Sequence, residues 1–210
     1  HLGKYICLDY AIYWGLLAAF IIKYLICSVN PAIEICKLKT GEDIRKLGSG
    51  NAGTANAMRV LGKPLGTVVI ICDILKVFIS LAIVYVIGKI FKQDISVMLK
   101  SVFILAAVIG HCYPIYYKFR GGKGVIVGMT TAFILDAKTA LICMIVGVIV
   151  ILITRTVAMG TLIGTIVYVV ITIFSVKECV IPVIIACSII MFKHRANIKR
   201  ILTRQEEKIW

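Results

Sequence analysis

The sequence is poor in acidic residues, and its cysteines do not pair at metal-binding spacing. Only 10 Asp and Glu oppose 24 Lys and Arg, so the formal net charge is +14. The eight cysteines are scattered, and most lie in or beside apolar runs, which favours free buried thiols over a disulfide framework or a zinc site. No internal repeat, low-complexity tract or heptad run occurs, so a duplicated transporter architecture gains no support. No cleavable signal sequence is recognisable either, and no metal or cofactor is expected.

Long polar stretches are scarce as well. Hydrophobic residues make up 60% of the 210 residues, and the mean hydropathy is +1.00, whereas soluble domains are about 45–50% apolar. The surplus must face lipid, and a membrane span takes roughly 20 residues. Residues 1–210 are therefore interpreted as one integral membrane domain with about half a dozen crossings, which leaves no room for a separate soluble catalytic domain. The positive charge then indicates membrane topology and anionic ligands, not nucleic-acid binding.

Seven apolar segments are expected to form the transmembrane helices of an all-α, polytopic protein. The most secure is 156–176, which contains no ionisable group. Segments 124–135 and 179–192 are shorter than a full span, so each is expected to be tilted, to thin the bilayer locally, or to be re-entrant. The remaining segments are 10–29, 65–88, 98–117 and 139–154.

The distribution of basic residues predicts the orientation. Of the 24 Lys and Arg, 16 lie in residues 31–64, 118–123, 155 and 193–210, which alternate crossings place on one side. Because loops that stay in the cytoplasm are basic, this side is expected to be cytoplasmic. The amino terminus then lies outside and the carboxyl terminus inside, as an odd number of crossings requires. The predicted location is the cell (plasma) membrane, which is the inner membrane where a cell has two.

The first polar stretch, residues 46–59, combines glycines, amides and a cation between two apolar segments. It contains Gly48, Ser49, Gly50, Asn51, Gly53, Asn56 and Arg59. Glycine lets backbone N–H groups approach a ligand closely, and such groups beside an Arg form an anion cradle. The alternative is a flexible polar connector, which would need neither the clustered Asn nor the helix-compatible stretch leading to Arg59.

The second polar stretch, residues 110–124, begins with Gly110 and His111 and ends with Gly121, Gly122, Lys123 and Gly124 at the start of an apolar segment. Amides at a helix N-terminus with a Lys among them are suited to bind phosphate. The spacing is not that of a nucleotide-binding P-loop, which needs a longer glycine spacing and a Ser or Thr after the Lys. The alternative is a basic juxtamembrane loop in which glycines interrupt the helices.

Two further groups of residues are candidates. His194, Arg195 and Asn197 follow the last apolar segment and are expected to share one helix face on the same side as both glycine loops, although a histidine there is often only interfacial. Asp73 and Lys76 lie three residues apart inside an apolar segment. Intramembrane charges are costly and often functional, but these two could simply neutralise each other.

Taken together, these stretches resemble the bacterial acyl-phosphate:glycerol-3-phosphate acyltransferase family. The resemblance runs from about residue 28 to residue 204, through 43–59, 110–114, 119–124 and 194–197 in matching order. Four ordered motifs in one small membrane chain are far more specific than any one of them. The chain departs from the family pattern at 27–31, to which no function is assigned, and at 157–161, where a hydroxyl remains only on Thr161.

The resemblance implies a seven-helix membrane enzyme that transfers an acyl group from acyl phosphate to the 1-hydroxyl of glycerol 3-phosphate, giving lysophosphatidic acid and phosphate as the first step of phospholipid synthesis. The expected partners are these two substrates, membrane lipid and the enzyme that supplies acyl phosphate. The expected catalytic residues are Ser49, Arg59, Lys123, His194 and Asn197. The expected substrate contacts are Gly48, Gly50, Asn51, Asn56, His111, Gly121, Gly122, Gly124, Thr161 and Arg195.

For these two substrates, the residue types suggest which side chains bind each one. Lys123 and the amides of residues 121–124 are expected to hold acyl phosphate and its developing oxyanion, while Arg59, His194 and Asn197 position glycerol 3-phosphate. Either His194 or the departing phosphate takes the proton. The rival interpretation is a membrane transporter of phosphate esters. It is disfavoured because a transporter places polar groups near the bilayer midplane, whereas here they gather on one side.

Overall fold

The structure, a computed structural model, describes residues 2–90, 97–175 and 177–209, which form helices and their connecting loops. Among them are seven apolar helices, one for each predicted segment; five match within about two residues where their ends are described, whereas α1 begins at Leu2 and not at residue 10, and α5 ends at Cys112 and not at residue 117. The helices are α1 (Leu2–Cys27), α2 (Pro31–Thr40), η1 (Ile44–Lys46), α3 (Thr54–Leu61), α4 (Lys63–Ile90), α5 (Val97–Cys112), η2 (Ile115–Tyr117), α6 (Val125–Leu135), α7 (Ala137–Thr154), α8 (Val157–Ser175), η3 (Lys177–Cys179), α9 (Val180–Lys193) and α10 (Arg195–Leu202). The predicted end of one segment at 176, and Lys92 among the basic residues, lie outside the described residues.

The apolar helices differ in length. By length and composition, the described residues contain four candidate membrane spans: Trp14–Thr40, which runs from α1 into α2, and one each in α4, α7 and α8. A fifth arises if α9 and α10, bent by 56°, count as one span. α5 and α6 are apolar but shorter. The predicted all-α, polytopic fold with some short segments is confirmed, whereas a full crossing by all seven helices stays a prediction.

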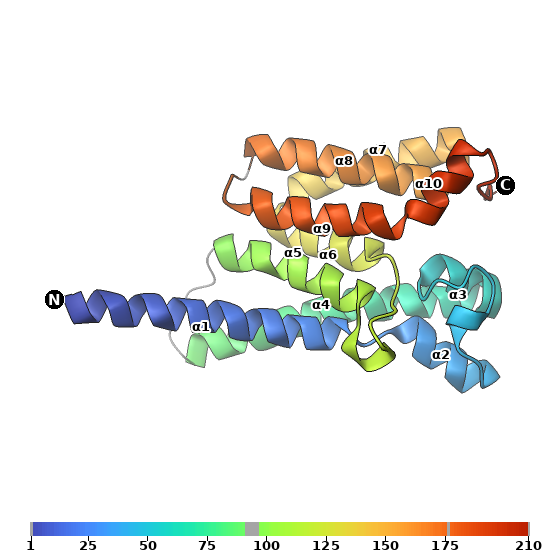
Figure 1. Ribbon diagram of the computed structural model, residues 1–210. Coiled ribbons are helices and arrows are strands. Elements are labelled where there is room, and N and C mark those ends of the chain that lie inside the picture. Colours follow the sequence, from blue (N-terminus) through green and yellow to red (C-terminus); the bar gives the residue numbers. More distant parts are fainter. Residues whose placement is uncertain (1, 91–96, 176, 210) are drawn as a thin grey trace.

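The helices pack in layers around α5. In Figure 1, α7 and α8 form one side, α1 and α4 the opposite side, and α5, α6 and α9 lie between them; α5 contacts α1, α6 and α9. Glycines let α7 and α8 approach closely, since a Cβ on Gly160 would lie 2.4 Å from the carbonyl oxygen of Gly147. Small residues at such crossings are typical of membrane helices, which associate by close packing.

Three buried charged side chains inside the apolar helices, those of Lys23, Asp73 and Lys76, have partners. Lys23 on α1 is fully buried, donates to the carbonyl of Val77 and lies over the ring of Phe103. Asp73 and Lys76 on α4 form an ion pair of 2.8 Å, and Lys76 Nζ also donates to the carbonyl of Val29. This pairing explains how long apolar helices tolerate charges inside a membrane.

Short polar elements gather at one end of the bundle, on the right in Figure 1, where α2, α3, α10 and the carboxyl terminus lie; the amino terminus lies at the other end. α2 begins there because Asn30 accepts a hydrogen bond from Ile33 N and Pro31 follows it, and it ends at Gly41 in the left-handed conformation. The polar motifs therefore share one end of the molecule, as predicted.

Candidate functional site

The first loop, residues 47–53, is shaped by the side chain of Asn56. Its Oδ1 accepts from Ser49 N at 2.8 Å, and its Nδ2 donates to the carbonyls of Ile44 and Leu47 at 3.3 and 3.0 Å. Gly48 has a φ of 54°, a left-handed turn that favours glycine. Asn56 is therefore buried beneath the loop and fixes its shape, while Ser49 is exposed on it, beside Gly48 and Gly50.

The second loop, residues 113–124, folds back onto the carboxyl end of α5. Gly121 N donates to Cys112 O at 3.2 Å and Gly122 N to His111 O at 3.1 Å. These carbonyls lack partners within the helix because they lie in its last turn. The expectation that the amides of residues 121–124 all hold a ligand is therefore wrong for Gly121 and Gly122, whose N–H groups already bond to α5.

The same two glycines allow close contact between segments. A Cβ on Gly121 would lie 2.0 Å from His111 O, and one on Gly122 would lie 2.2 Å from His111 Nε2 and 2.6 Å from the carbonyl oxygen of Ala52. Ala52 belongs to the first loop, and its carbonyl also accepts from Asn30 Nδ2 at 3.1 Å. The two glycine loops therefore touch each other at Gly122 and Ala52.

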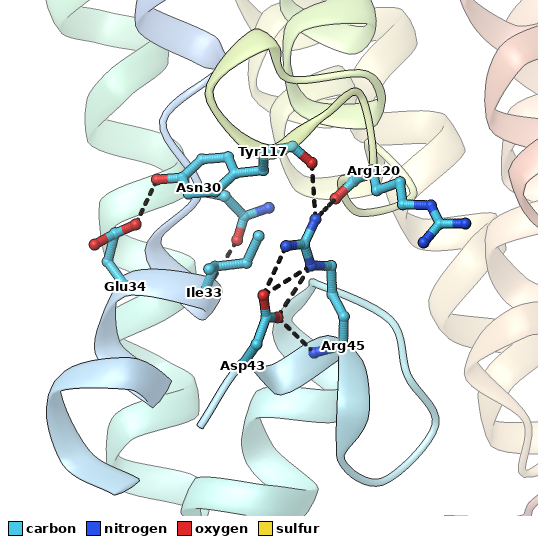
Figure 2. A network of polar contacts seen from close by, with 7 residues as sticks. All are labelled: Asn30, Ile33, Glu34, Asp43, Arg45, Tyr117 and Arg120. Atoms are coloured by element: carbon cyan, nitrogen blue, oxygen red, sulfur yellow. Dashed lines mark hydrogen bonds and ion pairs between the residues drawn. The ribbon is translucent and has the colours of Figure 1, made fainter. Parts of the chain in front are cut away.

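Arg45, in η1 just before the first loop, bonds to the second loop. Its guanidinium is held by Asp43 at 2.6 Å and donates to the carbonyls of Tyr117 and Arg120 at 2.8 and 2.9 Å (Figure 2). The hydrogen bond from Arg45 lowers the pKa of Asp43, so the carboxylate stays ionised and keeps the guanidinium in place. A further contact, Tyr117 OH to Glu34 at 2.7 Å, ties the second loop to α2.

Lys123 joins the second loop to α10. Its Nζ donates to Asn197 Oδ1 at 2.6 Å, and Asn197 Nδ2 donates to Glu206 Oε1 at 2.5 Å. Burial lowers the pKa of Lys123 to about 8; Glu206 acts in the opposite direction, and the cations of Arg200 and Arg59 lower it further. The ammonium group of Lys123 thus lies among cations in a half-buried place, where an added anion would be strongly stabilised.

Two arginines complete this group. Arg59, in the last turn of α3, forms an ion pair with Glu207, and Arg200 on α10 lies 2.7 Å from Glu206. We call Arg59, Lys123 and Arg200 the cationic cluster. Its three residues come from α3, from the second loop and from α10.

The residues around His194 separate into two groups. His194 and Asn197 are buried, whereas Arg195 is exposed, donates to the carbonyl of Phe192 and lies over its ring. The expectation that all three share one face is therefore wrong for Arg195, because consecutive helical residues are about 100° apart. The hydroxyl of Thr161 donates to Val157 O within α8, and in the described residues it makes no hydrogen bond to the cationic cluster.

His111 lies beneath the second loop. It is buried, and its Nδ1 is 3.1 Å from Lys76 Nζ and 3.5 Å from Asp73 Oδ1. The intramembrane pair of Asp73 and Lys76 thus supports the residue on which Gly122 rests. The pair also contacts the chain beside Asn30, because Lys76 Nζ donates to the carbonyl of Val29.

Several residues of this end were not expected from the sequence. Asn30, Arg45, Arg200 and Glu206 hold the loops or the cluster together. Asn30 stands before Pro31, a recognisable helix start, but its second bond to Ala52 has no local signal. The partners of Arg45 are mostly backbone carbonyls, which no sequence motif reveals.

Comparison with known proteins places this arrangement in one family. The family model described as glycerol-3-phosphate acyltransferase matches residues 17–204. A glycerol-3-phosphate acyltransferase of Thermoanaerobacter pseudethanolicus is 35% identical over 90% of this chain and 93% of its own length, and a glycerol-3-phosphate acyltransferase 2 of Bacillus cereus is 38% identical over 90% and 92%.

A solved structure agrees with the sequence relatives. The crystal structure of PlsY (YgiH), an integral membrane glycerol 3-phosphate acyltransferase in its glycerol 3-phosphate form, superposes with a TM-score of 0.81 at 34% identity, covering 93% of this chain and 96% of that one. Its lysophosphatidic acid form gives a TM-score of 0.78 at 30% identity, covering 93% and 95%. The resemblance stated from the motifs is confirmed, and the chain belongs to the glycerol-3-phosphate acyltransferase family.

Proposed function

We propose that this chain transfers an acyl group from an acyl phosphate to the 1-hydroxyl of glycerol 3-phosphate, releasing lysophosphatidic acid and inorganic phosphate. The observation that carries the proposal is the cationic cluster. Its member Lys123 donates a hydrogen bond of 2.6 Å to the neighbouring Asn197. Both substrates carry phosphate, so an enzyme for them needs closely spaced anion-binding groups. The two solved PlsY structures, one a glycerol 3-phosphate form and the other a lysophosphatidic acid form, support this acceptor and product.

Lys123 and the start of α6 are suited to hold the acyl phosphate. The first-turn N–H groups of α6 have no acceptor within the helix, and Gly124 at its N-cap provides no side-chain cap. These amides and the ammonium of Lys123 can donate to phosphate oxygens and to the oxyanion that develops on the acyl carbonyl. Gly121 and Gly122 contribute by setting the loop against α5.

Arg59, Asn197 and His194 are suited to hold glycerol 3-phosphate, with Ser49 at the edge of the first loop. His194 Nδ1 is 2.8 Å from the carbonyl oxygen of Ile190, which can only accept, so this nitrogen carries the proton. Nε2 of the neutral ring is then the acceptor. His194 can therefore orient the hydroxyl of glycerol 3-phosphate through Nε2.

The reaction is a direct displacement at the acyl carbonyl. The hydroxyl oxygen attacks the carbonyl carbon, an ester bond forms, and the bond between that carbon and the phosphate oxygen breaks. Phosphate leaves with the electron pair, and the hydroxyl proton passes to it directly or through His194 Nε2. The donor is already activated, so the step requires no covalent enzyme intermediate.

An apolar groove offers a place for the acyl tail. It has a volume of about 330 Å³ between α8 and α9 and is lined by Ile166, Val169, Val170, Ile184 and Met191, among others. Met191 lies about one helical turn before His194, so the groove leads toward the proposed reacting groups.

The basic end is proposed to face the cytoplasm, with the amino terminus outside.

The test gives the purified protein in detergent palmitoyl phosphate with and without glycerol 3-phosphate and measures phosphate release. Palmitoyl-CoA with glycerol 3-phosphate is the control donor, and because it would release CoA and not phosphate, its turnover is measured as lysophosphatidic acid. We expect release that needs both palmitoyl phosphate and glycerol 3-phosphate, with stoichiometric lysophosphatidic acid detected by mass spectrometry. Turnover with palmitoyl-CoA alone would refute the proposed donor. No turnover with either donor in folded protein would refute the acyl transfer and favour a transporter of phosphate esters.

A further inference from the structure

Residues 205–209 fold back across the polar end of the bundle, and we call them the acidic tail. The chain reverses direction after α10, where Arg204 has a φ of 57° and Gln205 N donates to Arg200 O at 2.7 Å. Ile209 N then donates to Arg155 O at 2.9 Å, just before α8 begins. The acidic tail is therefore fastened at both ends.

Two carboxylates of the acidic tail lie on the proposed phosphate-binding groups. Glu206 Oε1 accepts from Asn197 Nδ2 at 2.5 Å, and Glu206 Oε2 lies 2.7 Å from Arg200 Nε. Glu207 forms an ion pair with Arg59. The cationic cluster is thus already neutralised in part by the chain's own carboxylates.

Carboxylate and phosphate compete for such groups because both accept charge-assisted hydrogen bonds from guanidinium and amide donors. Glu206 takes one of the two N–H donors of Asn197 Nδ2, so that donor is not available to a substrate while the acidic tail is in place. The outer contact is weak, since the side chains of Arg59 and Glu207 are 42% and 67% exposed, and exposed ion pairs contribute little. The acidic tail also follows residue 204, where the match to the family model ends.

We propose that the acidic tail is an internal competitor for the phosphate site, in which Glu206 and Glu207 occupy the cationic cluster until the terminal phosphate group of a substrate displaces them. The inference rests on the proposed function, because the occupied groups are those assigned there to the substrate phosphates. Glycerol 3-phosphate and acyl phosphate share the competing chemistry. Enzyme assays with each substrate varied in turn identify which of them displaces the acidic tail.

The kinetic test uses the double variant E206Q/E207Q, which keeps the size of both side chains and removes their charge. We expect the KM for glycerol 3-phosphate, for palmitoyl phosphate, or for both to fall roughly fivefold, the size of an exposed or half-exposed ion pair, with kcat nearly unchanged. The matched control is E42Q, because Glu42 is an exposed carboxylate far along the chain from the acidic tail. Unchanged KM values for both substrates, or the same fall in E42Q, would overturn the proposal.

A second measurement does not depend on turnover. Carboxypeptidase trimming of the folded wild-type protein in detergent, followed by mass spectrometry, should become faster on adding glycerol 3-phosphate or palmitoyl phosphate, but not on adding glycerol. Trimming that neither glycerol 3-phosphate nor palmitoyl phosphate accelerates would overturn the proposal while leaving acyl transfer intact. Trimming accelerated by either compound in a protein without turnover would support the acidic tail as a phosphate competitor and refute the acyl transfer.

Discussion

Each of the two glycine loops contains three glycines, but different contacts hold the two loops in place. In the first loop, Asn56 organises the backbone from below, and the cation, Arg59, follows on α3. In the second loop, Gly121 and Gly122 dock on α5 through their own amides, and the cation, Lys123, lies within the loop. In the first loop a glycine forms a left-handed turn, and in the second loop glycines allow close contact with α5. Substituting a glycine should therefore have different effects in the two loops.

The largest difference between the loops is expected from their lysines. Lys123→Ala removes the ammonium that bonds to Asn197 and that is proposed to stabilise the oxyanion, so kcat should fall at least about a hundredfold. Lys46, which precedes the first loop, is exposed, and Lys46→Ala should leave kcat near the wild-type value. Phosphate-release assays on both variants, with thermal unfolding to verify folding, test this. Near-normal turnover by folded Lys123→Ala would contradict the proposed role.

A glycine substitution compares close contact with backbone strain. Gly122→Ala places a Cβ 2.2 Å from His111 Nε2 and 2.6 Å from Ala52 O, and should destabilise the protein by about 3 kcal/mol. In the first loop Gly50, with a φ of 71°, has open space apart from Arg45 O at 3.3 Å. Gly50→Ala should therefore cost only about 1 kcal/mol. Thermal unfolding in detergent should show the larger drop in Tm for Gly122→Ala, and equal drops would argue against docking through Gly122.

A third comparison breaks the connection between the loops. Arg45→Ala removes the guanidinium that donates to the carbonyls of Tyr117 and Arg120, and each such charged bond contributes about 1.5–3 kcal/mol. We expect kcat/KM to fall about tenfold as the loops lose their alignment. Arg120→Ala is the control, because only the backbone carbonyl of Arg120 takes part and its side chain points away (Figure 2). An equal loss in both variants would indicate a general effect of surface charge.

Much of this fold can be predicted from the sequence, because a membrane imposes simple rules. Backbone groups in lipid must bond within helices, so long apolar runs such as 156–176 predict helices directly. The cost of unpaired charge also predicts that polar motifs gather outside the apolar runs, as α2, α3 and α10 do at one end. The partners of buried Lys23, in contrast, depend on packing between α1, α4 and α5.

The contacts of the site are harder to predict. The motifs indicated Lys123, Asn197 and Arg59, but glycine-rich sequence does not say whether an amide faces a ligand or the preceding helix, and Gly121 and Gly122 face α5. The acidic tail carries no motif, and its contact with Arg59 joins residues 148 apart in the chain. Such contacts follow from the arrangement of whole helices, which local sequence patterns do not record.

The smallest expected effect, between about pH 7 and about pH 8, is a pH dependence that belongs to the second loop alone. Burial lowers the pKa of Lys123 to about 8, whereas arginine keeps its charge throughout this range. Because the amine loses its proton as pH rises, kcat/KM should halve near pH 8 and fall about tenfold for each further pH unit. A Lys123→Arg variant with measurable activity should lack this decline, and Arg59→Lys should keep it. A wild-type profile that stays flat from about pH 7 to about pH 9.5 would show that the charge of Lys123 does not limit the reaction.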